Sequence, residues 1–287
     1  MTAFKEIKKR INSIKNTRKT TAAMKMVSSS KLRKAESVIS NMLPYSAALH
    51  HVMESLLTGD EVSDLSRERP VNNVAIIAFS SDSSLCGAFN SNIARELQKA
   101  VGIYGKSLPA DRIAVYTIGR KIYDAVGKTD IKVTKNFEDL AGKADYQAIA
   151  DLAESLIAQF ENGETDRVDM IYHHFKSAGV QELVHEALLP VALPRKKDAD
   201  SRILTEYIYE PSREEILRVI IPKSIKLQLY TALLDSNASE HAARMIAMQT
   251  ATDNADDLIS ELTVEYNKSR QQAITNELLD LFNGNIG

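Results

Sequence analysis

Residues 212–282 form one run without glycine, SREEILRVIIPKSIKLQLYTALLDSNASEHAARMIAMQTATDNADDLISELTVEYNKSRQQAITNELLDLF. Glycine in a helix interior costs about 1 kcal/mol relative to alanine, and Pro222 is the only proline in the run. The run therefore predicts one helix, which at about 1.5 Å per residue would be roughly 105 Å long. A helix of that length needs a partner along its surface, because isolated helices are marginally stable in water.

The N-terminal stretch, residues 1–58, supplies a candidate partner. It also lacks glycine, and its apolar and small residues recur at steps of three, four or seven, as in an amphipathic helix or a coiled coil. Pro44 lies inside this stretch and is expected to kink it. The stripe consists of Ile7, Ile11, Ile14, Thr21, Met24, Ser28, Leu32, Ala35, Ile39 and Met42.

Small and polar residues occupy stripe positions where a strong zipper would have leucine or isoleucine. Thr21 and Ser28 do so in the first stretch, and Ala232, Ser236, Ser239 and Ala243 do so in the last one. Such residues let two helices approach closely but bury little apolar area. We therefore expect the paired helices to be braced by something outside them.

Charge is distributed unevenly between the two ends. The first forty residues hold eleven lysines or arginines and two glutamates, whereas residues 238–282 hold eight acidic and three basic residues. The two ends are therefore expected to attract each other.

The middle of the chain alternates between strand and helix patterns. Buried parallel strands are predicted at residues 73–79, 112–118 and 168–175, and helices between them at 90–101, 120–126 and 146–160. Residues 181–189 and 205–210 are candidate further strands, whose direction the sequence does not reveal. The predicted fold class is α/β: a long antiparallel coiled coil of the N- and C-terminal helices plus a Rossmann-like domain with a mostly parallel sheet. The predicted segments are 1–58 for the first helix, 59–72 for a linker, 73–210 for the α/β domain and 211–287 for the last helix.

Candidate chemical sites are weak. The loop 80–90 follows the first strand, where α/β proteins often bind phosphate, but it holds only Gly87, and Asp82 would repel an anion. The adjacent His173 and His174 should point apart rather than share a metal, and Cys86, the only cysteine, is expected to be buried and cannot form an intramolecular disulfide. We predict no catalytic residues, no metal and no cofactor.

Two other functions stay open on the residues alone. One is a nucleotide-dependent α/β enzyme built on the middle domain, and the other is a basic coiled coil that binds nucleic acid. Against the second, Phe4 is the only aromatic residue in the basic stretch that could stack on bases, so we expect no nucleic-acid partner. No stretch approaches eighteen consecutive apolar residues, so no direct membrane span is expected.

The terminal segments closely resemble the gamma subunit family of F-type ATP synthases. The motifs are KEIKKRINSIKNTRKT at 5–20, AMKMVSSSKLRK at 23–34, ASEHAARMIAM at 238–248, ATDN at 251–254, YNKSRQ at 266–271 and ITNEL at 274–278. The loop also matches the family pattern at Ser81-Asp82 and Leu85-Cys86-Gly87. Ser83-Ser84 replaces the family's Arg-Gly, and Ala88 replaces a glycine, which puts any contact through that arginine in doubt.

The resemblance implies a central rotor shaft without an active site of its own. It would turn inside a head of alternating alpha and beta subunits and couple proton flow through the membrane ring to ATP synthesis or hydrolysis on the beta subunits. The implied partners are the alpha, beta, delta and epsilon subunits and the membrane c-ring, with one copy of this chain per complex. The implied location is the cytoplasmic face of a bacterial inner membrane, as a peripheral protein.

The resemblance also implies roles for single residues. A docking loop comprises Asp82, Leu85, Cys86 and Gly87, and the foot on the membrane ring comprises Tyr207 and Glu210. An apolar bearing comprises Leu278, Leu279, Leu281 and Phe282. The rotor–head contacts are Met24, Lys25, Arg244, Gln271, Thr275, Glu277 and Asp280. Their alternatives are structural: Met24 packs in the seam, and Arg244 pairs only with the neighbouring helix.

Overall fold

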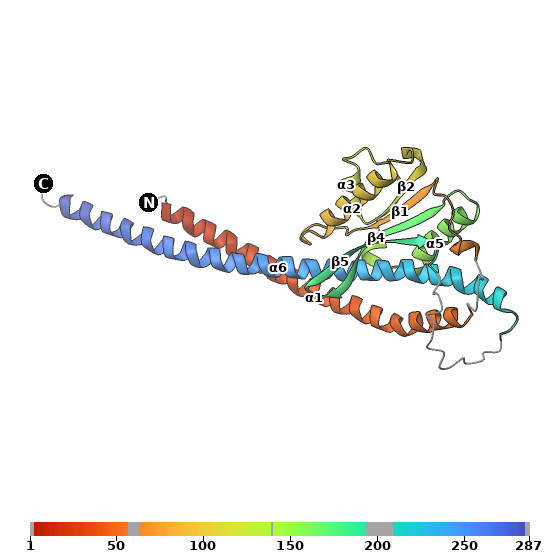
Figure 1. The fold of residues 1–287 in the computed structure, drawn as a ribbon. Coiled ribbons are helices and arrows are strands. Elements are labelled where there is room, and N and C mark those ends of the chain that lie inside the picture. Colours follow the sequence, from red (N-terminus) through yellow and green to blue (C-terminus); the bar gives the residue numbers. More distant parts are fainter. Residues whose placement is uncertain (1–2, 57–62, 139, 193–208, 285–287) are drawn as a thin grey trace, which may run out of the picture. The chain divides into compact units, whose positions relative to one another are not determined.

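The computed structural model describes residues 3–56, 63–138, 140–192 and 209–284. The chain divides into two compact units. Unit 1 combines the two ends of the chain, residues 1–30 and 244–287, and unit 2 comprises residues 31–243. Two long helices, α1 and α6, contribute to both units (Figure 1).

Both long helices are continuous. Helix α1 spans Ala3–Leu56 and α6 spans Arg213–Gly284, and each contains a proline in its interior, Pro44 and Pro222. Ser212 caps the start of α6, because its hydroxyl accepts the backbone N–H of Glu215 at 3.2 Å. Glu214 and Glu215 in the first turn also favour the positive end of the helix dipole. The single helix predicted for residues 212–282 is confirmed.

In unit 1 the two helices run antiparallel. The Phe4 and Tyr266 rings lie 6.3 Å apart, Arg18 pairs with Asp256, and Thr21 contacts Thr252, so residue numbers rise along α1 as they fall along α6. On α6 the buried apolar residues recur at the seven-residue spacing of a coiled coil. They are Met248, Ala255 and Leu262. The pairing predicted from the periodic stripe is confirmed here.

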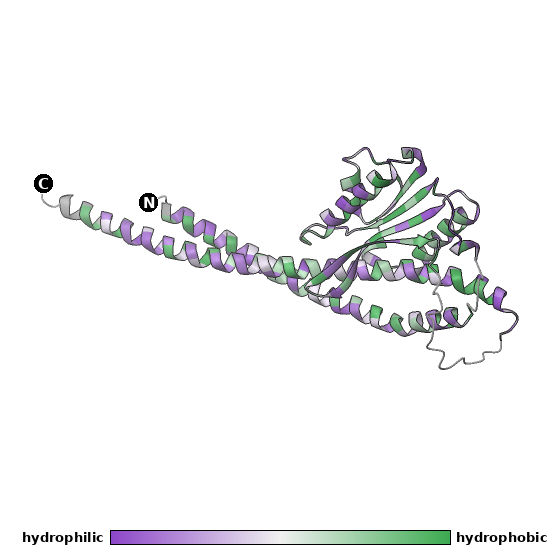
Figure 2. Ribbon diagram, viewed as in Figure 1, coloured by the Kyte–Doolittle hydropathy of each residue, from purple (hydrophilic) through white to green (hydrophobic). Residues whose placement is uncertain are grey.

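The predicted stripe is turned inward along α1. Ile11, Thr21, Ser28 and Leu32 are buried, and the other members of the stripe are half-buried. On α6, Ala232, Ser236 and Ser239 are buried as well. Figure 2 shows the result, with hydrophilic and hydrophobic residues interleaved along both long helices and mostly hydrophobic central strands in the sheet.

Unit 2 contains a five-stranded sheet in the order β3-β2-β1-β4-β5. The first four strands are parallel and β5 is antiparallel to β4. The strands are β1 (Val74–Phe79), β2 (Ile113–Ile118), β3 (Val133–Phe137), β4 (Arg167–Ser177) and β5 (Val180–Leu189). The mostly parallel sheet is therefore confirmed, and β3 is an additional edge strand that the sequence did not predict.

Helices cover both faces of the sheet. Helices α2 (Phe89–Tyr104) and α3 (Arg120–Val126) pack on one face, around Ile93, Leu97 and Ile122. On the other face lie α5 (Tyr146–Glu161), the end of α1 and the first turns of α6, with Leu156, Leu56 and Ile225 buried among them. The short elements are η1 (Asp64–Ser66), η2 (Ala110–Arg112) and α4 (Leu140–Lys143). The sheet thus packs directly on the long C-terminal helix.

A partly buried ion pair anchors the chain where it enters the sheet. The Arg69 Nε lies 2.9 Å from Asp166 Oδ1, and the Arg69 guanidinium stacks 4.2 Å over the Phe160 ring. The second carboxylate oxygen of Asp166 accepts the backbone N–H groups of Asn72 and Asn73. Both oxygens of a nearly buried carboxylate are therefore satisfied, as a buried charge requires.

Candidate functional site

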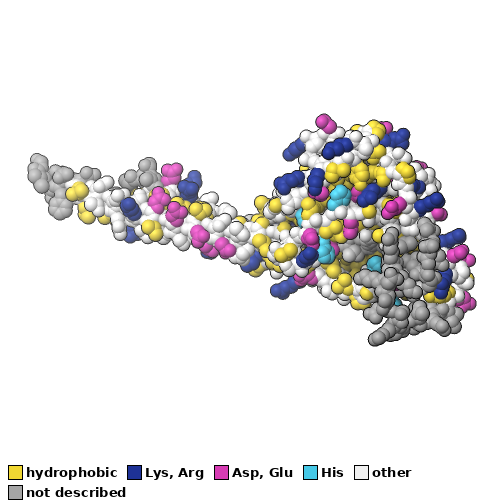
Figure 3. All heavy atoms as spheres, viewed as in Figure 1, with side chains coloured by type: hydrophobic (Ala, Val, Ile, Leu, Met, Phe, Trp, Pro, Cys, Tyr) yellow, Lys and Arg dark blue, Asp and Glu magenta, His cyan; other side chains and the backbone are white. Residues whose placement is uncertain are grey.

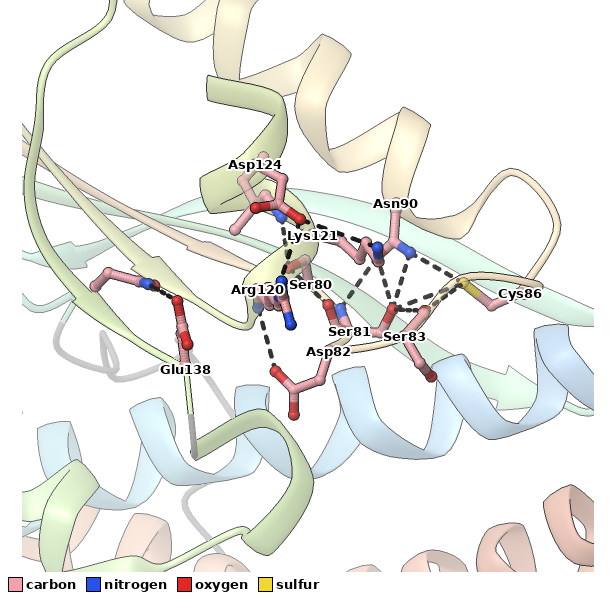
Figure 4. A network of polar contacts seen from close by, with 12 residues as sticks. Ser80, Ser81, Asp82, Ser83, Cys86, Asn90, Arg120, Lys121, Asp124 and Glu138 are labelled. Atoms are coloured by element: carbon pink, nitrogen blue, oxygen red, sulfur yellow. Dashed lines mark hydrogen bonds and ion pairs between the residues drawn. The ribbon is translucent and has the colours of Figure 1, made fainter. Parts of the chain in front are cut away.

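The loop between β1 and α2 is held by hydrogen bonds within itself (Figure 4). The Ser81 N–H donates to Asn90 Oδ1 at 3.1 Å, and the Ser81 hydroxyl donates to the Ser83 carbonyl at 2.7 Å. The Asn90 amide in turn donates to Cys86 Sγ at 3.1 Å. The first residue of the loop is also fixed, because the Ser80 hydroxyl accepts the N–H of Ile122 in α3.

The predicted docking residues separate into inward and outward groups. Cys86 is 1% exposed, as expected for a small apolar side chain. Leu85 is 58% exposed and has a φ of 70°, a conformation that a non-glycine residue adopts rarely. Gly87 has a φ of 59°, which glycine adopts without strain. Leu85 is therefore the apolar side chain that this loop presents to solvent.

Asp82 has a structural contact of its own. Its carboxylate accepts the backbone N–H of Arg120 at 3.1 Å, at the start of α3. Just before that helix, Gly119 has a φ of 97°, and a Cβ there would lie 2.3 Å from the Ser80 carbonyl oxygen. The backbone of the loop and the backbone at the start of α3 therefore lie in direct contact, with no room for a side chain at Gly119.

An open hollow of about 530 Å³ lies beside the loop. Its walls include Leu85, Gly87 and Ser91, together with the positively charged Arg95 and Lys121. Small-molecule sites are mostly enclosed and apolar, whereas this hollow is open and of mixed polarity. The hollow therefore lacks the enclosure that is typical of a small-molecule site.

The two adjacent histidines point to opposite faces of β4, as predicted. His173 is 3% exposed and stacks on Phe89 with ring centroids 4.5 Å apart, and burial lowers its pKa to about 4. His174 faces α6, with its Nδ1 2.5 Å from Asp235 Oδ2. Within the described residues no group of three histidine, cysteine or acidic side chains is placed to hold a metal ion.

A second polar cluster lies between β4, β5 and α2. The buried Asp169 accepts hydrogen bonds from Tyr104 at 2.5 Å and Arg167 at 2.8 Å, and lies 3.2 Å from His185. Burial alone would raise the pKa of Asp169, but the hydrogen bonds from His185 and Tyr104 and the Arg167 charge lower it. The hydrogen bond to Asp169 raises the pKa of His185 against the opposing effect of burial. This cluster joins α2 to the antiparallel edge of the sheet.

In unit 1 the predicted rotor–head residues occupy different environments. Met24 and Lys25 on α1 are half-buried, and Arg244 on α6 is only 8% exposed. Gln271 and Thr275 are exposed on successive turns of α6, with the Thr275 hydroxyl donating to the Gln271 carbonyl. Glu277 and Asp280 belong to α6, but their side chains lie outside the described residues.

The end of α6 continues past the start of α1 (Figure 1). On this part Leu278 is 52% exposed and Leu279 is 55% exposed, whereas the side chains of Leu281 and Phe282 are outside the described residues. Figure 3 shows basic, acidic and hydrophobic side chains mixed along the outer part of the paired helices. Of the predicted foot, Glu210 is exposed and Tyr207 lies outside the described residues.

The polar contacts that were not predicted from the sequence include Arg69–Asp166, Asp169–His185 and His174–Asp235. Asp169 did leave a signal, since it is the one acidic residue inside the apolar run 168–172. In the part of the chain that the structure describes, no helix has both the length and the apolar composition needed to cross a bilayer.

Two long helices that run antiparallel in unit 1, one of which packs on a Rossmann-like sheet in unit 2, are the fold of a stalk-type protein. The family model for ATP synthase (ATP-synt) matches residues 3–285. The chain is 49% identical to the ATP synthase gamma chain of Bacteroides fragilis over 290 residues, which covers 100% of both chains. It is 41% identical to the ATP synthase gamma chain of Flavobacterium johnsoniae, covering 99% of this chain and 98% of that one. The chain therefore belongs to the ATP synthase gamma chain family, as its motifs predicted.

Solved structures share the fold at lower sequence identity. A central stalk of the Tetrahymena thermophila mitochondrial ATP synthase matches with a TM-score of 0.62 and 24% identity, covering 81% of this chain and 99% of that one. A chain of the Euglena gracilis mitochondrial ATP synthase matches with a TM-score of 0.67 and 19% identity, covering 98% and 92%. Family membership makes the chain a subunit of the ATP synthase complex rather than a free-standing enzyme.

Proposed function

We propose that this chain is the central rotor shaft of a bacterial F-type ATP synthase and couples proton flow to ATP synthesis or hydrolysis by rotation. The observation that carries the proposal is the continuity of α6. One helix of 72 residues packs against the sheet in unit 2, pairs with α1 in unit 1, and then continues past the start of α1. A continuous helix can transmit a rotation along its length, and the only proline in α6, Pro222, lies in its first turns, ahead of the part that pairs with α1 in unit 1.

The free end of α6 would turn inside the head of alternating alpha and beta subunits. Leu278 and Leu279 are exposed, and with Leu281 and Phe282 they would form an apolar bearing. Apolar contacts are non-directional, so they resist rotation less than a ring of directed hydrogen bonds would. Exposure of two large apolar side chains on a single helix supports this role, because a helix that met only water would gain nothing from them.

Contacts to the beta subunits would come from residues of unit 1, most of them polar or charged. We assign them to Met24, Lys25, Arg244, Gln271, Thr275, Glu277 and Asp280. The exposure of Gln271 and Thr275 favours such contacts, whereas the burial of Arg244 favours its structural alternative, a contact within the paired helices. Coupling requires that these contacts differ between the conformational states of the beta subunits, because equal contact with every state would shift none of them.

The α/β domain would face the membrane side of the complex. Tyr207 and Glu210 would form the foot on the c-ring, and the epsilon subunit would pack on this domain. Leu85, on the loop with Asp82, Cys86 and Gly87, offers an exposed apolar docking point beside the positively charged hollow. The complex would hold one copy of this chain, together with alpha and delta subunits, on the cytoplasmic face of the inner membrane.

Purification from membranes tests the proposal. A tagged copy of the chain should recover the alpha, beta, delta and epsilon subunits together with the c-ring, and it should restore ATP-driven proton pumping to vesicles from cells that lack the native gene. Calorimetry on the purified chain should show no ATP or NAD binding. Recovery of the chain without the beta subunit, or proton pumping that is unaffected by its absence, would reject the shaft function.

A further inference from the structure

Two residues one turn apart on α6 hold two successive residues of β4. The Ser239 hydroxyl donates to the His173 carbonyl at 3.1 Å, and Asp235 Oδ2 lies 2.5 Å from His174 Nδ1. Residues four apart lie on the same face of a helix, so both contacts come from one side of α6. Asp235 is 5% exposed and Ser239 is fully buried, and all four residues belong to unit 2.

The rest of the contact between α6 and the α/β domain is mainly apolar, with Leu229, Ala232 and Leu233 in the core. Other directed contacts of α6 lie farther toward its N-terminus and reach the segments outside the sheet: the Tyr230 hydroxyl donates to the Ala144 carbonyl at 3.1 Å, and Lys226 pairs with Glu154. Apolar packing of small and aliphatic residues depends on the volume that is filled, and it tolerates alternative arrangements better than a hydrogen bond does. Packing alone would therefore discriminate weakly between α6 in its observed position and α6 moved along its axis by one turn.

The polar contacts discriminate strongly between those positions. A shift of one turn, about 5.4 Å, in one direction would place Thr231 opposite His174 and the Asp235 carboxylate against the His173 carbonyl oxygen. A shift in the other direction would place Ser239 opposite His174 and Ala243 against that carbonyl. Either shift removes the Asp235–His174 contact, and an unpaired buried carboxylate is costly.

The pair is poorly suited to a purely stabilising role. Burial raises the pKa of Asp235, and the hydrogen bond from His174 acts in the opposite direction, so part of the gain from pairing is offset by the cost of burying the charge. Well-packed apolar residues often replace such pairs without loss of stability. What an apolar pair would not supply is a preference for one register.

We propose that His174, Asp235 and Ser239 are positioning residues that fix the axial register of the α/β domain on the shaft helix, and with it the angle at which the domain is carried when the shaft turns. A shift of four residues along α6 also rotates the helix relative to the sheet. Without a fixed register, the angle between the membrane ring and the catalytic head would vary from molecule to molecule. The inference rests on the proposed shaft function and adds three residues to it.

The test compares a double variant, His174→Leu with Asp235→Leu, with the unmodified pair. Spin labels on cysteines that replace the exposed Val180 of β5 and Val219 of α6 report the register in the full chain, and the buried Cys86 should remain unlabelled. With the native pair we expect one narrow distance distribution. In the double variant we expect a melting temperature that is unchanged or higher, but a second distance population displaced by about 5 Å.

The assembled enzyme provides the functional readout. In membrane vesicles the double variant should pump fewer protons per ATP hydrolysed, whereas the conservative His174→Gln, which keeps a donor for Asp235, should couple normally. A matched control removes another contact of α6, the Lys226–Glu154 ion pair, by Lys226→Leu with Glu154→Leu. This pair is largely exposed at Glu154, so its removal should change neither distance nor coupling.

Each outcome has a separate meaning. A single unshifted distance and normal coupling in the double leucine variant would overturn the positioning role while leaving the shaft function intact. Failure of the unmodified chain to restore proton pumping would instead reject the shaft function, and the distance measurement would still decide whether the pair sets the register.

Discussion

Thr21 and Thr252 meet across the paired helices with their hydroxyl oxygens 2.8 Å apart. Each hydroxyl also lies within hydrogen-bond distance of a carbonyl of its own helix, Thr21 with Arg18 and Thr252 with Met248. A hydroxyl has one proton, so only one threonine donates across the seam at a time. At this position the two helices are therefore held together by a hydrogen bond between hydroxyls, where a strong coiled coil would have leucine.

Replacing both threonines by valine should preserve or raise the stability of the paired helices. Valine has nearly the same shape, and a threonine that remains after a single substitution can still donate to a carbonyl of its own helix. Either single substitution should therefore cost at most about 1 kcal/mol, and the double substitution no more than a single one. Hydrogen exchange of residues 3–30 in the full chain measures the effect. Additive destabilisation in Thr21→Val with Thr252→Val would contradict this account of the seam.

Gly119→Ala should destabilise unit 2 strongly. The new Cβ would lie 2.3 Å from the Ser80 carbonyl oxygen, at a φ of 97° that alanine disfavours. We expect a loss of roughly 3 kcal/mol or more in urea unfolding. The matched control is Gly102→Ala, where nothing lies within 4 Å of the added Cβ. In the interior of α2 it should stabilise by about 0.5–1 kcal/mol, and equal effects of the two changes would contradict the prediction.

Arg69→Lys should weaken the anchor at the entry to the sheet although it keeps the charge. Lysine cannot both pair with Asp166 and stack its flat group on Phe160 as arginine does. We expect a loss of about 1–2 kcal/mol in the free energy of unfolding. Asp166→Asn should cost at least as much, because one carboxylate oxygen accepts two backbone N–H groups. Unchanged urea midpoints for both variants would disprove the anchoring role.

Stability should fall as the pH drops from about 6.5 to about 4, partly because of His173. Burial holds its pKa at about 4 in the folded chain, whereas an unfolded histidine takes up a proton near pH 6.5. In that window the unfolded state binds more protons, so folding weakens on acidification by up to ~1.4 kcal/mol per pH unit. His173→Leu should flatten this part of the pH profile of unfolding.

His185 provides the control of opposite sign. Its pKa is raised in the folded chain by the hydrogen bond to Asp169, so its contribution is fully present below about pH 6.5 and is lost as the pH rises through the raised value. His185→Leu should therefore reduce the pH dependence on the alkaline side. If the free energy of unfolding of His173→Leu fell with decreasing pH as steeply as that of the unmodified chain, groups other than His173 would be responsible for the loss of stability in acid.

Leu278→Gln with Leu279→Gln should impair the enzyme without unfolding the chain. Both side chains are more than half exposed, so the melting temperature of the purified chain should change little. In membranes we expect slower ATP hydrolysis, because two polar amides would enter an apolar bearing without hydrogen-bond partners. Val264→Gln is a control on the same helix at an exposed apolar position, and we expect it to be silent. A normal rate of ATP hydrolysis in the double variant would show that Leu278 and Leu279 are not part of the bearing.

The long-range architecture could be read from the sequence because its signals are local and repeated. The absence of glycine predicted α6, periodic small and apolar residues predicted its partner α1, and continuous apolar runs predicted β1, β2 and β4. Strand β3 escaped because it lies at the edge of the sheet and carries Lys135 and Asn136, so it shows no continuous apolar run. The antiparallel direction of β5 follows from the two-residue connection between β4 and β5, which is too short for a crossover to a parallel strand.

The candidate site was only partly readable for the same reason. The loop could be located from its position after β1 and from its family motif, but the pairing of Asp82 with the start of α3 spans 38 residues of sequence. His174 and Asp235 are 61 residues apart, and Arg69 and Asp166 are farther apart still. One sequence carries no record of which distant charges meet, so these contacts emerge only in three dimensions.

The continuity of α6 also has a mechanical consequence. Between Arg213 and Asn283 it contains no glycine, and Pro222 is its only proline. Pro222 removes one backbone hydrogen bond near the start of the helix. Beyond it a twist would meet neither glycine nor proline and would be shared among about seventeen helical turns, each deformed only slightly. Such an element acts as a distributed torsion spring, able to store elastic energy while the load lags and to return it smoothly.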